Sequence, residues 1–168
     1  MSIQKFYAAA QNMEFARDFQ FRVRALGPFT EQDLLYLRTA SLPAKSIVSK
    51  EVPYMGLKFN IPGSTIYDGS NAWEVLFWSD EAGNLRNKME SWLAEIFNDE
   101  TSTGKYGVPT EVATFDLLGK NLETLRRYQF IGIFPTKVGE LKYDIQGDGK
   151  PMDLSMTFAY QYWRLIGA

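Results

Sequence analysis

Apolar and polar residues alternate along several stretches of this chain, a period of two that is typical of β-strands with one buried face. The longest stretch covers residues 152–163, where every even position is apolar or aromatic and most odd positions are polar. This length predicts one strand that crosses a whole sheet or barrel, because most strands have only about five or six residues. Together with the segment that begins at Tyr128, it is predicted to organise a β-rich domain.

The same alternation predicts shorter strands elsewhere. Pro53 and Pro62 confine two of them to sheet edges or strand ends, because proline has no N–H to donate to a neighbouring strand. Residues 63–71 are rich in Gly, Ser, Asp and Asn, which predicts a turn region. The predicted strands cover residues 19–25, 33–40, 47–54, 57–61, 73–78, 111–118 and 124–134.

Turn signals recur about every ten residues, which favours a sandwich or barrel over alternating strands and helices. We therefore predict a mainly β fold, a β-barrel or β-sandwich of about 7–9 strands. One flanking helix is expected at about residues 80–97, where Ser79 or Asp80 can cap its N-terminus. Its apolar residues form one stripe that is expected to pack against the sheet, namely Leu85, Met89, Trp92, Leu93 and Ile96.

The length of 168 residues predicts a single domain over residues 1–168. Residues 1–17 are interpreted as a short helix or an arm that docks on another surface. Residues 98–110 form a polar, glycine-containing loop, the best candidate for a mobile segment. We expect no membrane span, because no apolar run approaches the roughly 20 residues of a membrane helix, and no signal peptide, because the N-terminal segment lacks an apolar centre.

The composition removes several classes of function. The chain has no cysteine, and therefore no disulfide framework, thiolate zinc site or cysteine nucleophile. It has no histidine, which removes the Ser/His/Asp devices and the commonest general base and metal ligand. The net charge of −2 argues against a protein that grips nucleic acid. We expect a protein that is not an enzyme and has no catalytic, cofactor-binding or metal-binding residues.

Three local motifs have structural readings that outweigh functional ones. Gly147–Lys150 lacks the spacing of a phosphate-binding loop and predicts a hairpin turn instead. Asp144, Gln146 and Asp148 lack the final glutamate of a calcium loop. Arginines at positions 22, 24, 126 and 127 are interpreted as solvated strand faces balanced by nearby acids.

The aromatic content is high, with 4 Trp, 9 Tyr and 12 Phe. Near the chain end, an aromatic cluster comprises Tyr160, Tyr162, Trp163, Phe130 and Phe134. Two interpretations stay open: a rich core, or aromatic residues that line contacts between subunits.

Several segments resemble the tail tube proteins of contractile-tailed, T4-like bacteriophages. The block Pro135–Leu141 (Pro-Thr-Lys-Val-Gly-Glu-Leu) and the closing aromatic strand are specific in combination, and the chain departs from the family around residues 27–33 and 98–110. The other segments that carry the resemblance are residues 14–17, 39–44, 47–53, 57–63, 79–92, 132–134 and 158–163.

The resemblance implies a structural virion protein. Its copies would form hexameric rings that stack into the hollow inner tail tube, which serves as the conduit for DNA during ejection. It also implies a tail sheath, baseplate and tail-terminator proteins as partners, with the tape measure protein and DNA passing through the lumen without specific binding. The implied location is the virion tail, assembled in the host cytoplasm.

Alternatives remain within and outside this class. Type VI secretion and phage-tail-like particles have related tubes, so the chain is also interpreted as the tube of an injection particle or as a tube-initiating baseplate protein. A β-barrel that carries an apolar ligand suits the same composition, and an enzyme that uses carboxylates is a third class. Within the tube interpretation, residues 1–17, 42–63 and 98–110 are expected to contact neighbouring subunits or rings.

Overall fold

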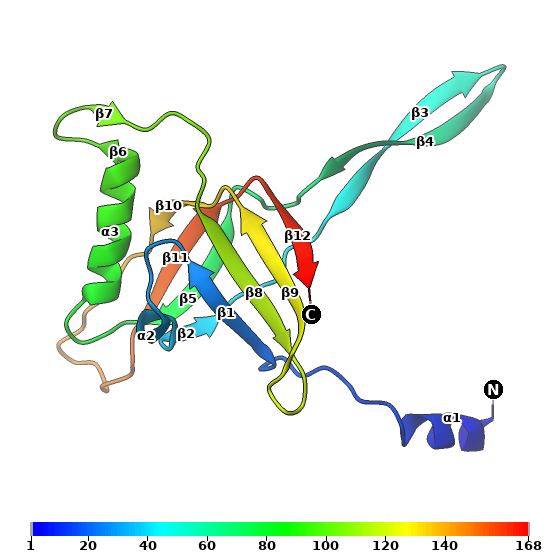
Figure 1. Cartoon of the computed structure of the whole chain (residues 1–168), viewed down its shortest axis with the longest axis horizontal. Coiled ribbons are helices and arrows are strands. Elements are labelled where there is room, and N and C mark those ends of the chain that lie inside the picture. Colours follow the sequence, from blue (N-terminus) through cyan, green and yellow to red (C-terminus); the bar gives the residue numbers. More distant parts are fainter. Residues whose placement is uncertain (1, 168) are drawn as a thin grey trace.

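The computed structural model describes residues 2–167, which form a β-sandwich with long extensions (Figure 1). Two antiparallel sheets of four strands each make the body. Sheet A has the strand order β1 (Phe21–Leu26), β8 (Val112–Leu118), β9 (Thr124–Ile131) and β12 (Tyr162–Gly167). Sheet B has the order β10 (Phe134–Val138), β11 (Asp153–Ala159), β5 (Trp73–Trp78) and β2 (Leu37–Thr39).

The core lies between the inner faces of the two sheets. Trp73 of sheet B stacks on Phe130 of sheet A with ring centroids 4.7 Å apart, so aromatic contacts link the two layers directly. Burial of this apolar surface is the main force that holds the sheets together. The largest fully buried apolar side chains are Phe77, Phe130, Phe158, Leu26, Leu85, Met89, Ile133, Leu154, Met156 and Val75.

Helix α3 (Asn84–Ile96) confirms the predicted helix, although it begins four residues later than expected. Its buried residues are Leu85, Met89 and Trp92, three members of the predicted stripe. The carboxylate of Asp80 accepts hydrogen bonds from the N–H groups of Asn84 (2.8 Å) and Leu85 (3.2 Å). Asp80 therefore supports the first turn from outside the helix. In the described part of the chain, no helix is long and apolar enough to cross a membrane.

Two predicted long strands are wrong, because each divides and changes sheet. Residues 152–163 become β11 in sheet B and β12 in sheet A, and residues 124–134 become β9 in sheet A and β10 in sheet B. Both breaks lie at one corner, where the N–H of Gln161 donates to the carbonyl of Ile131 (2.9 Å). The described chain therefore has twelve strands instead of about 7–9, although the mainly β sandwich class is confirmed.

The strand predicted at residues 33–40 is wrong in its first half. Thr30 and Asp33 form a reciprocal capping box, which starts the short helix α2 (Glu31–Leu34) before β2 begins. Lys88 of α3 donates to the carboxylate of Asp33, so this ion pair joins the two helices.

Three extensions leave the sandwich (Figure 1). Helix α1 (Ile3–Ala10) forms most of the N-terminal arm. Strands β3 (Ser46–Tyr54) and β4 (Leu57–Ile66) form a long two-stranded hairpin, so the turn predicted at 63–71 begins too early. Strands β6 (Phe97–Asn98) and β7 (Thr103–Gly104) form a small pair at the start of the expected 98–110 loop.

Gly147–Lys150 lies in the connection between the antiparallel strands β10 and β11, as the predicted hairpin requires. The connection covers residues 139–152 and is longer than a tight turn. Its hydrogen-bonded turn lies slightly earlier, where the N–H of Gly147 donates to the carbonyl of Asp144 (3.1 Å).

We expect the corner between the sheets to tolerate only glycine at position 132. Gly132 has φ +66°, and a Cβ there would lie 2.6 Å from Cγ of Gln161 and 3.1 Å from the carbonyl oxygen of Pro109. Gly132→Ala should lower the free energy of unfolding by about 2–3 kcal/mol in urea titrations, from left-handed strain plus the clash. Gly149→Ala is the control, since Gly149 has φ +79° but open space around it, and should cost about 1 kcal/mol. Equal costs would contradict the close approach at the corner.

We also expect acid to weaken the link between α2 and α3. Burial acts to raise the pKa of Asp33, but hydrogen bonds from Lys88 and Thr30 lower it below its ordinary value. Because the folded-state pKa is depressed, the stabilisation is present above about pH 4 and is lost as the pH falls through the folded-state pKa. The difference in unfolding free energy between wild type and Asp33→Asn should be at most about 1 kcal/mol at pH 7 and shrink toward pH 3. A difference that stays constant with pH would contradict a stabilising role for the charged form of Asp33.

Candidate assembly surfaces

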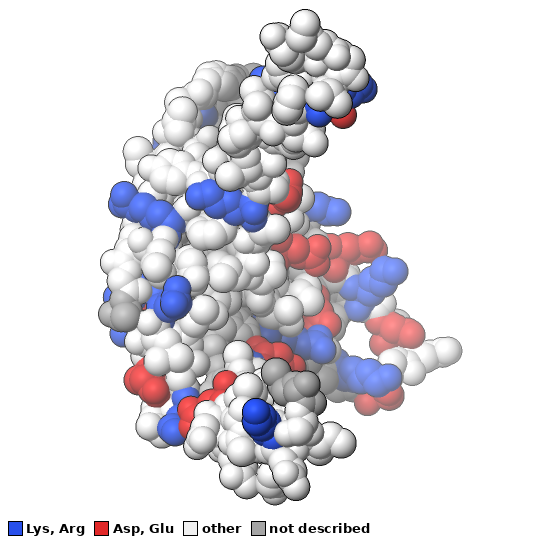
Figure 2. Space-filling model, turned by 90° about the vertical axis from the view of Figure 1, so that its right-hand side faces the viewer, with Lys and Arg blue, Asp and Glu red and all other residues white. Residues whose placement is uncertain are grey.

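Large apolar side chains that stay exposed concentrate on the extensions. Figure 2 views the molecule from the right-hand side of Figure 1, toward which the hairpin and the arm project. Most of the surface seen there belongs to uncharged residues. Apolar patches of this kind mark contact sites in soluble proteins. The exposed apolar residues of the extensions include Ile3, Phe6, Tyr7, Met13, Phe15, Ile47, Val52, Tyr54, Met55, Leu57, Phe59, Ile61, Ile66, Phe97, Tyr106 and Val108.

The β3–β4 hairpin has no covering layer on either face. Every residue of β4 is exposed, and Met55 at the tip is 87% exposed. The tip is a two-residue turn in which Met55 (φ 47°) and Gly56 (φ 83°) both adopt positive φ, the backbone that suits the twist of a hairpin. An isolated two-stranded hairpin is only marginally stable in water. Its apolar side chains are therefore available for contacts with another molecule.

An aromatic cluster holds the base of the hairpin on sheet A. Tyr67 follows β4 and meets Trp163 of β12 edge to face, with ring centroids 5.9 Å apart. Lys45 precedes β3, and its ammonium lies 5.4 Å from the Tyr67 ring centroid and 5.7 Å from that of Trp163. The direction of the hairpin is thus tied to the edge strand β12.

The N-terminal arm makes few contacts with the body. No residue of α1 is buried, although its apolar residues Ile3, Phe6 and Tyr7 share one face at helical spacing. The side chain of Ser2 caps the helix by accepting from the N–H of Lys5 (3.3 Å). Farther along the arm, Glu14 pairs with Lys120 of the β8–β9 turn at 2.6 Å, with both side chains largely exposed.

Each sheet of the sandwich has two open edges. Strands β1 and β12 border sheet A, and strands β10 and β2 border sheet B. An edge strand presents unpaired N–H and C=O groups that can template the addition of a further strand. The body therefore offers backbone contacts in addition to the apolar extensions.

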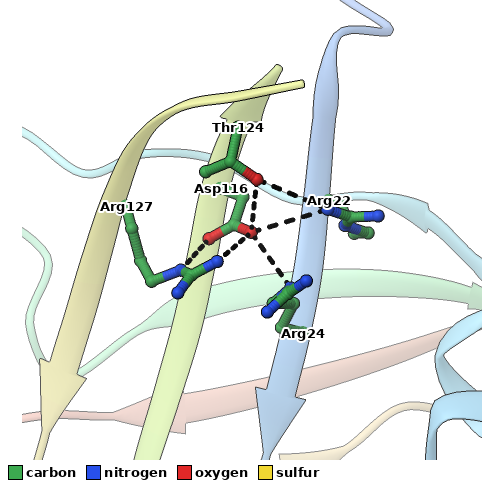
Figure 3. A network of polar contacts seen from close by, with 5 residues as sticks. All are labelled: Arg22, Arg24, Asp116, Thr124 and Arg127. Atoms are coloured by element: carbon green, nitrogen blue, oxygen red, sulfur yellow. Dashed lines mark hydrogen bonds and ion pairs between the residues drawn. The ribbon is translucent and has the colours of Figure 1, made fainter. Parts of the chain in front are cut away.

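Sheet A also carries a polar cluster around Asp116, the one buried charged side chain of the described residues (Figure 3). Arg127 donates from Nε (2.8 Å) and Nη2 (3.2 Å) to the two carboxylate oxygens, and Thr124 donates its hydroxyl (3.3 Å). Nε of Arg24 lies 3.3 Å and Nη2 of Arg22 lies 3.8 Å from Oδ2. The strand register places Arg22, Asp116 and Arg127 side by side on three neighbouring strands.

The electrostatic consequence is clearest at Arg127. The hydrogen bonds to the Asp116 carboxylate, and then its negative charge, raise the pKa of Arg127 above its ordinary value. Burial of Asp116 is tolerated because charged and hydroxyl donors replace the lost water.

Sequence reasoning missed Asp116. From the sequence, the arginines are expected to be solvated and balanced by nearby acids. Arg22 and Arg24 are half exposed, and with Arg127 they converge on this one carboxylate, while Arg126 takes no part in its ion pairs. The usable signal was a lone acidic residue inside an otherwise apolar strand.

The aromatic cluster near the chain end belongs mainly to the core. Phe130 and Tyr160 are buried, Phe134 and Trp163 are half-buried, and Tyr162 alone among the five is exposed. The exposed aromatic residues lie instead on the arm, the hairpin and the loops. Among residues 2–167, no group of three or more acidic side chains could hold a metal ion.

Comparisons with known proteins agree on one family. The sequence profile of a family described as phage tail tube protein matches residues 7–166. The chain is 29% identical over 161 residues to the tail tube protein gp19 of Enterobacteria phage T4, covering 92% of this chain and 94% of that protein. The gp19 protein of Enterobacteria phage T6 matches with the same identity and coverage.

Solved structures show the same fold at lower identity. The tube-terminating cap of the anti-feeding prophage has a TM-score of 0.67 at 16% identity, with 93% of each chain covered. A chain from the sheath–tube complex of an extracellular contractile injection system (PVC) has a TM-score of 0.65 at 13% identity, covering 100% of this chain and 99% of that one.

We expect Asp116 to contribute more to stability than an exposed ion pair. Asp116→Asn keeps the shape but leaves three arginines without their shared counter-charge, and should lower the unfolding free energy by about 1–3 kcal/mol. Asp153→Asn is the control, because Asp153 and Arg38 are each 44% exposed, and should cost about 0–1 kcal/mol. Thermal and urea unfolding measure both, and a smaller cost at position 116 than at 153 would contradict a stabilising role for the buried carboxylate.

Proposed function

We propose, from the premise that this chain belongs to the phage tail tube protein family and is a structural tail tube subunit, that its copies form hexameric rings. The rings stack into the hollow inner tube of a contractile tail. The observation that carries this proposal is the concentration of exposed apolar side chains on extensions outside a well-packed sandwich. The family assignment favours this function over those of an apolar-ligand carrier and a carboxylate enzyme.

Ring closure uses the sheet edges. A contact between β12 of one copy and β1 of the next is heterologous, so a rotation that closes after six copies gives a ring. The same edge-to-edge addition extends the backbone hydrogen bonding of sheet A around the ring.

Stacking uses the extensions. The hairpin projects far beyond the sandwich, and its exposed side chains bury apolar surface when they meet a neighbouring ring (Figure 1). The arm (residues 1–17) and the loop at residues 98–110 add contacts of the same kind. Axial contacts between identical rings do not close, so they generate a filament.

The partners follow from the tube. The similar injection-system chains come from a sheath–tube complex, a sheath/tube terminator and a six-fold symmetrised baseplate. We infer that this chain likewise contacts a tail sheath protein, a baseplate and a tail terminator. The tape measure protein and DNA pass through the lumen without specific binding. The subunit itself resides in the virion tail, which is assembled in the host cytoplasm.

A second candidate is the tube of a phage-tail-like injection particle, or a tube-initiating baseplate protein. The fold similarity to injection-system tube, cap and baseplate chains favours it. Genes for a capsid and terminase beside this one support the phage tube, whereas effector genes support the injection particle.

Negative-stain microscopy across a concentration series, with light scattering in parallel, tests assembly. Rings or hollow tubes that grow with concentration support the proposal. A chain that stays monomeric alone but forms tubes with a baseplate extract needs a nucleus, and one that stays monomeric with the extract overturns the proposal.

We expect a charge on the hairpin to block stacking without unfolding the subunit. Phe59 is 51% exposed on β4, so Phe59→Asp should leave the melting temperature nearly unchanged. It should raise the protein concentration needed for tubes at least about tenfold, because burying an unpaired carboxylate costs more than about 1.4 kcal/mol. Leu122→Asp is the matched control, since Leu122 is 65% exposed on the β8–β9 turn. Equal effects of the two variants on tube formation would argue against the hairpin as a stacking element.

A further inference from the structure

We propose that the solvent-facing side of sheet A is a binding surface for the phosphodiester backbone of nucleic acid, with Asp116 as its positioning residue. This inference goes beyond the tube function, which assigns no binding chemistry to either sheet.

Positive charge is concentrated on this sheet. Its four strands contain five arginines, no lysine and one acidic residue, Asp116, so they carry a net charge of +4. The strands of sheet B are balanced, with Arg38 and Lys137 against Glu74 and Asp153. The whole chain has a net charge of −2. The excess on sheet A is therefore a local feature that the overall charge conceals.

Strand register gathers four of these arginines on one face. Arg22 and Arg127 flank Asp116 on the neighbouring strands. Arg24 reaches the same carboxylate from the edge strand. Arg164 of β12 is paired with Gln129, two residues beyond Arg127 and hence on the same face, and donates to its side chain (3.3 Å).

The Asp116 carboxylate orients the guanidiniums but does not neutralise them. One negative charge faces three positive ones at Asp116, and Glu31 of α2 lines the same pocket as Arg22 and Arg24, so the positive charge is only partly compensated. The side chains of Arg22 and Arg24 are 46% and 51% exposed, so they present free N–H donors to the solvent. A planar guanidinium held in place is well suited to bind a phosphate group in a bidentate manner.

The centre of the cluster favours an anion over an apolar partner. No helix covers this face of sheet A in Figure 1, and strands β1 and β8 contribute none of the exposed large apolar residues of the described chain. The exposed apolar residues of sheet A lie on β9 and β12, namely Leu125, Tyr162, Leu165 and Ile166. The guanidiniums converge on one carboxylate, since Nη2 of Arg22 and Nη2 of Arg127 lie 3.8 Å and 3.2 Å from the same oxygen of Asp116. Such a compact group of cations fits the phosphate groups of a nucleic acid backbone.

Such contacts are compatible with a conduit. They involve few phosphates, carry no sequence preference and weaken with salt, so a nucleic acid chain can exchange one phosphate for the next. The expectation from the net charge of −2, that the protein makes no contacts with nucleic acid, is thereby revised for this one face.

The test is the binding of a fluorescein-labelled duplex DNA of mixed sequence, followed by anisotropy from 20 to 200 mM NaCl. The protein is kept below the concentration at which light scattering detects tubes. We expect binding at low salt with a log–log salt slope of about −2 to −3, as for two or three phosphate contacts. Arg22→Gln/Arg24→Gln should weaken binding at least about tenfold and reduce the slope by about 2. The control Lys142→Gln/Lys150→Gln makes the same charge change on the exposed β10–β11 loop and should retain wild-type binding.

Absence of binding at 20 mM NaCl, or equal losses in both double variants, would overturn the proposal. Tighter binding of poly-glutamate than of DNA would assign the surface to carboxylates of another protein. Competition by inorganic phosphate at concentrations similar to DNA phosphate would reduce it to a free-anion site. Circular dichroism checks that the Arg22→Gln/Arg24→Gln variant folds. If an Arg127→Gln variant binds DNA as tightly as the wild type, the arginine cluster is not the binding surface. Tube formation is scored separately by microscopy, so tubes without DNA binding would overturn this inference alone.

Discussion

The sandwich depends on a single corner at which two separate stretches of chain pass from one sheet to the other. Residues 131–134 and 159–162 lie side by side there, joined by the hydrogen bond from Gln161 to Ile131. Because the two crossings coincide, β9 pairs with β12 in sheet A and β10 pairs with β11 in sheet B. Residues 124–167 thus form one long antiparallel hairpin folded across both layers, and the glycine at position 132 permits the close approach that the fold requires.

This arrangement satisfies the interior strands and leaves the outer ones unpaired. Strand β12 ends the C-terminal hairpin at an open edge of sheet A, and Trp163 of the same strand supports the base of the β3–β4 hairpin. The edge proposed for ring closure and the extension proposed for stacking are therefore in physical contact. A tail tube subunit needs contacts within a ring and contacts between rings. In this chain the two proposed contacts meet where Lys45 lies over the rings of Tyr67 and Trp163.

The two sheets pack against each other but differ in charge. Both have apolar inner faces, yet the strands of sheet A are strongly cationic and those of sheet B are neutral. The buried carboxylate of Asp116 makes the dense arrangement of arginines possible, since guanidiniums this close repel one another without a shared counter-charge. A stabilising cross-strand contact and an ordered cationic surface are thus two consequences of the same residue.

The sequence by itself determined the mainly β class, the α3 helix and the apolar inner positions, because these follow from local periodicity and composition. The family resemblance rested instead on particular segments such as Pro135–Leu141. It could not show that residues 152–163 change sheets, since their alternation continues unbroken through the corner. The capping box of Thr30 and Asp33 is a local signal that the prediction of a strand at residues 33–40 did not take into account. Only the tertiary structure decided which strands pair, which edges stay open and which arginines meet Asp116, because register between distant segments is set by packing and not by any local pattern.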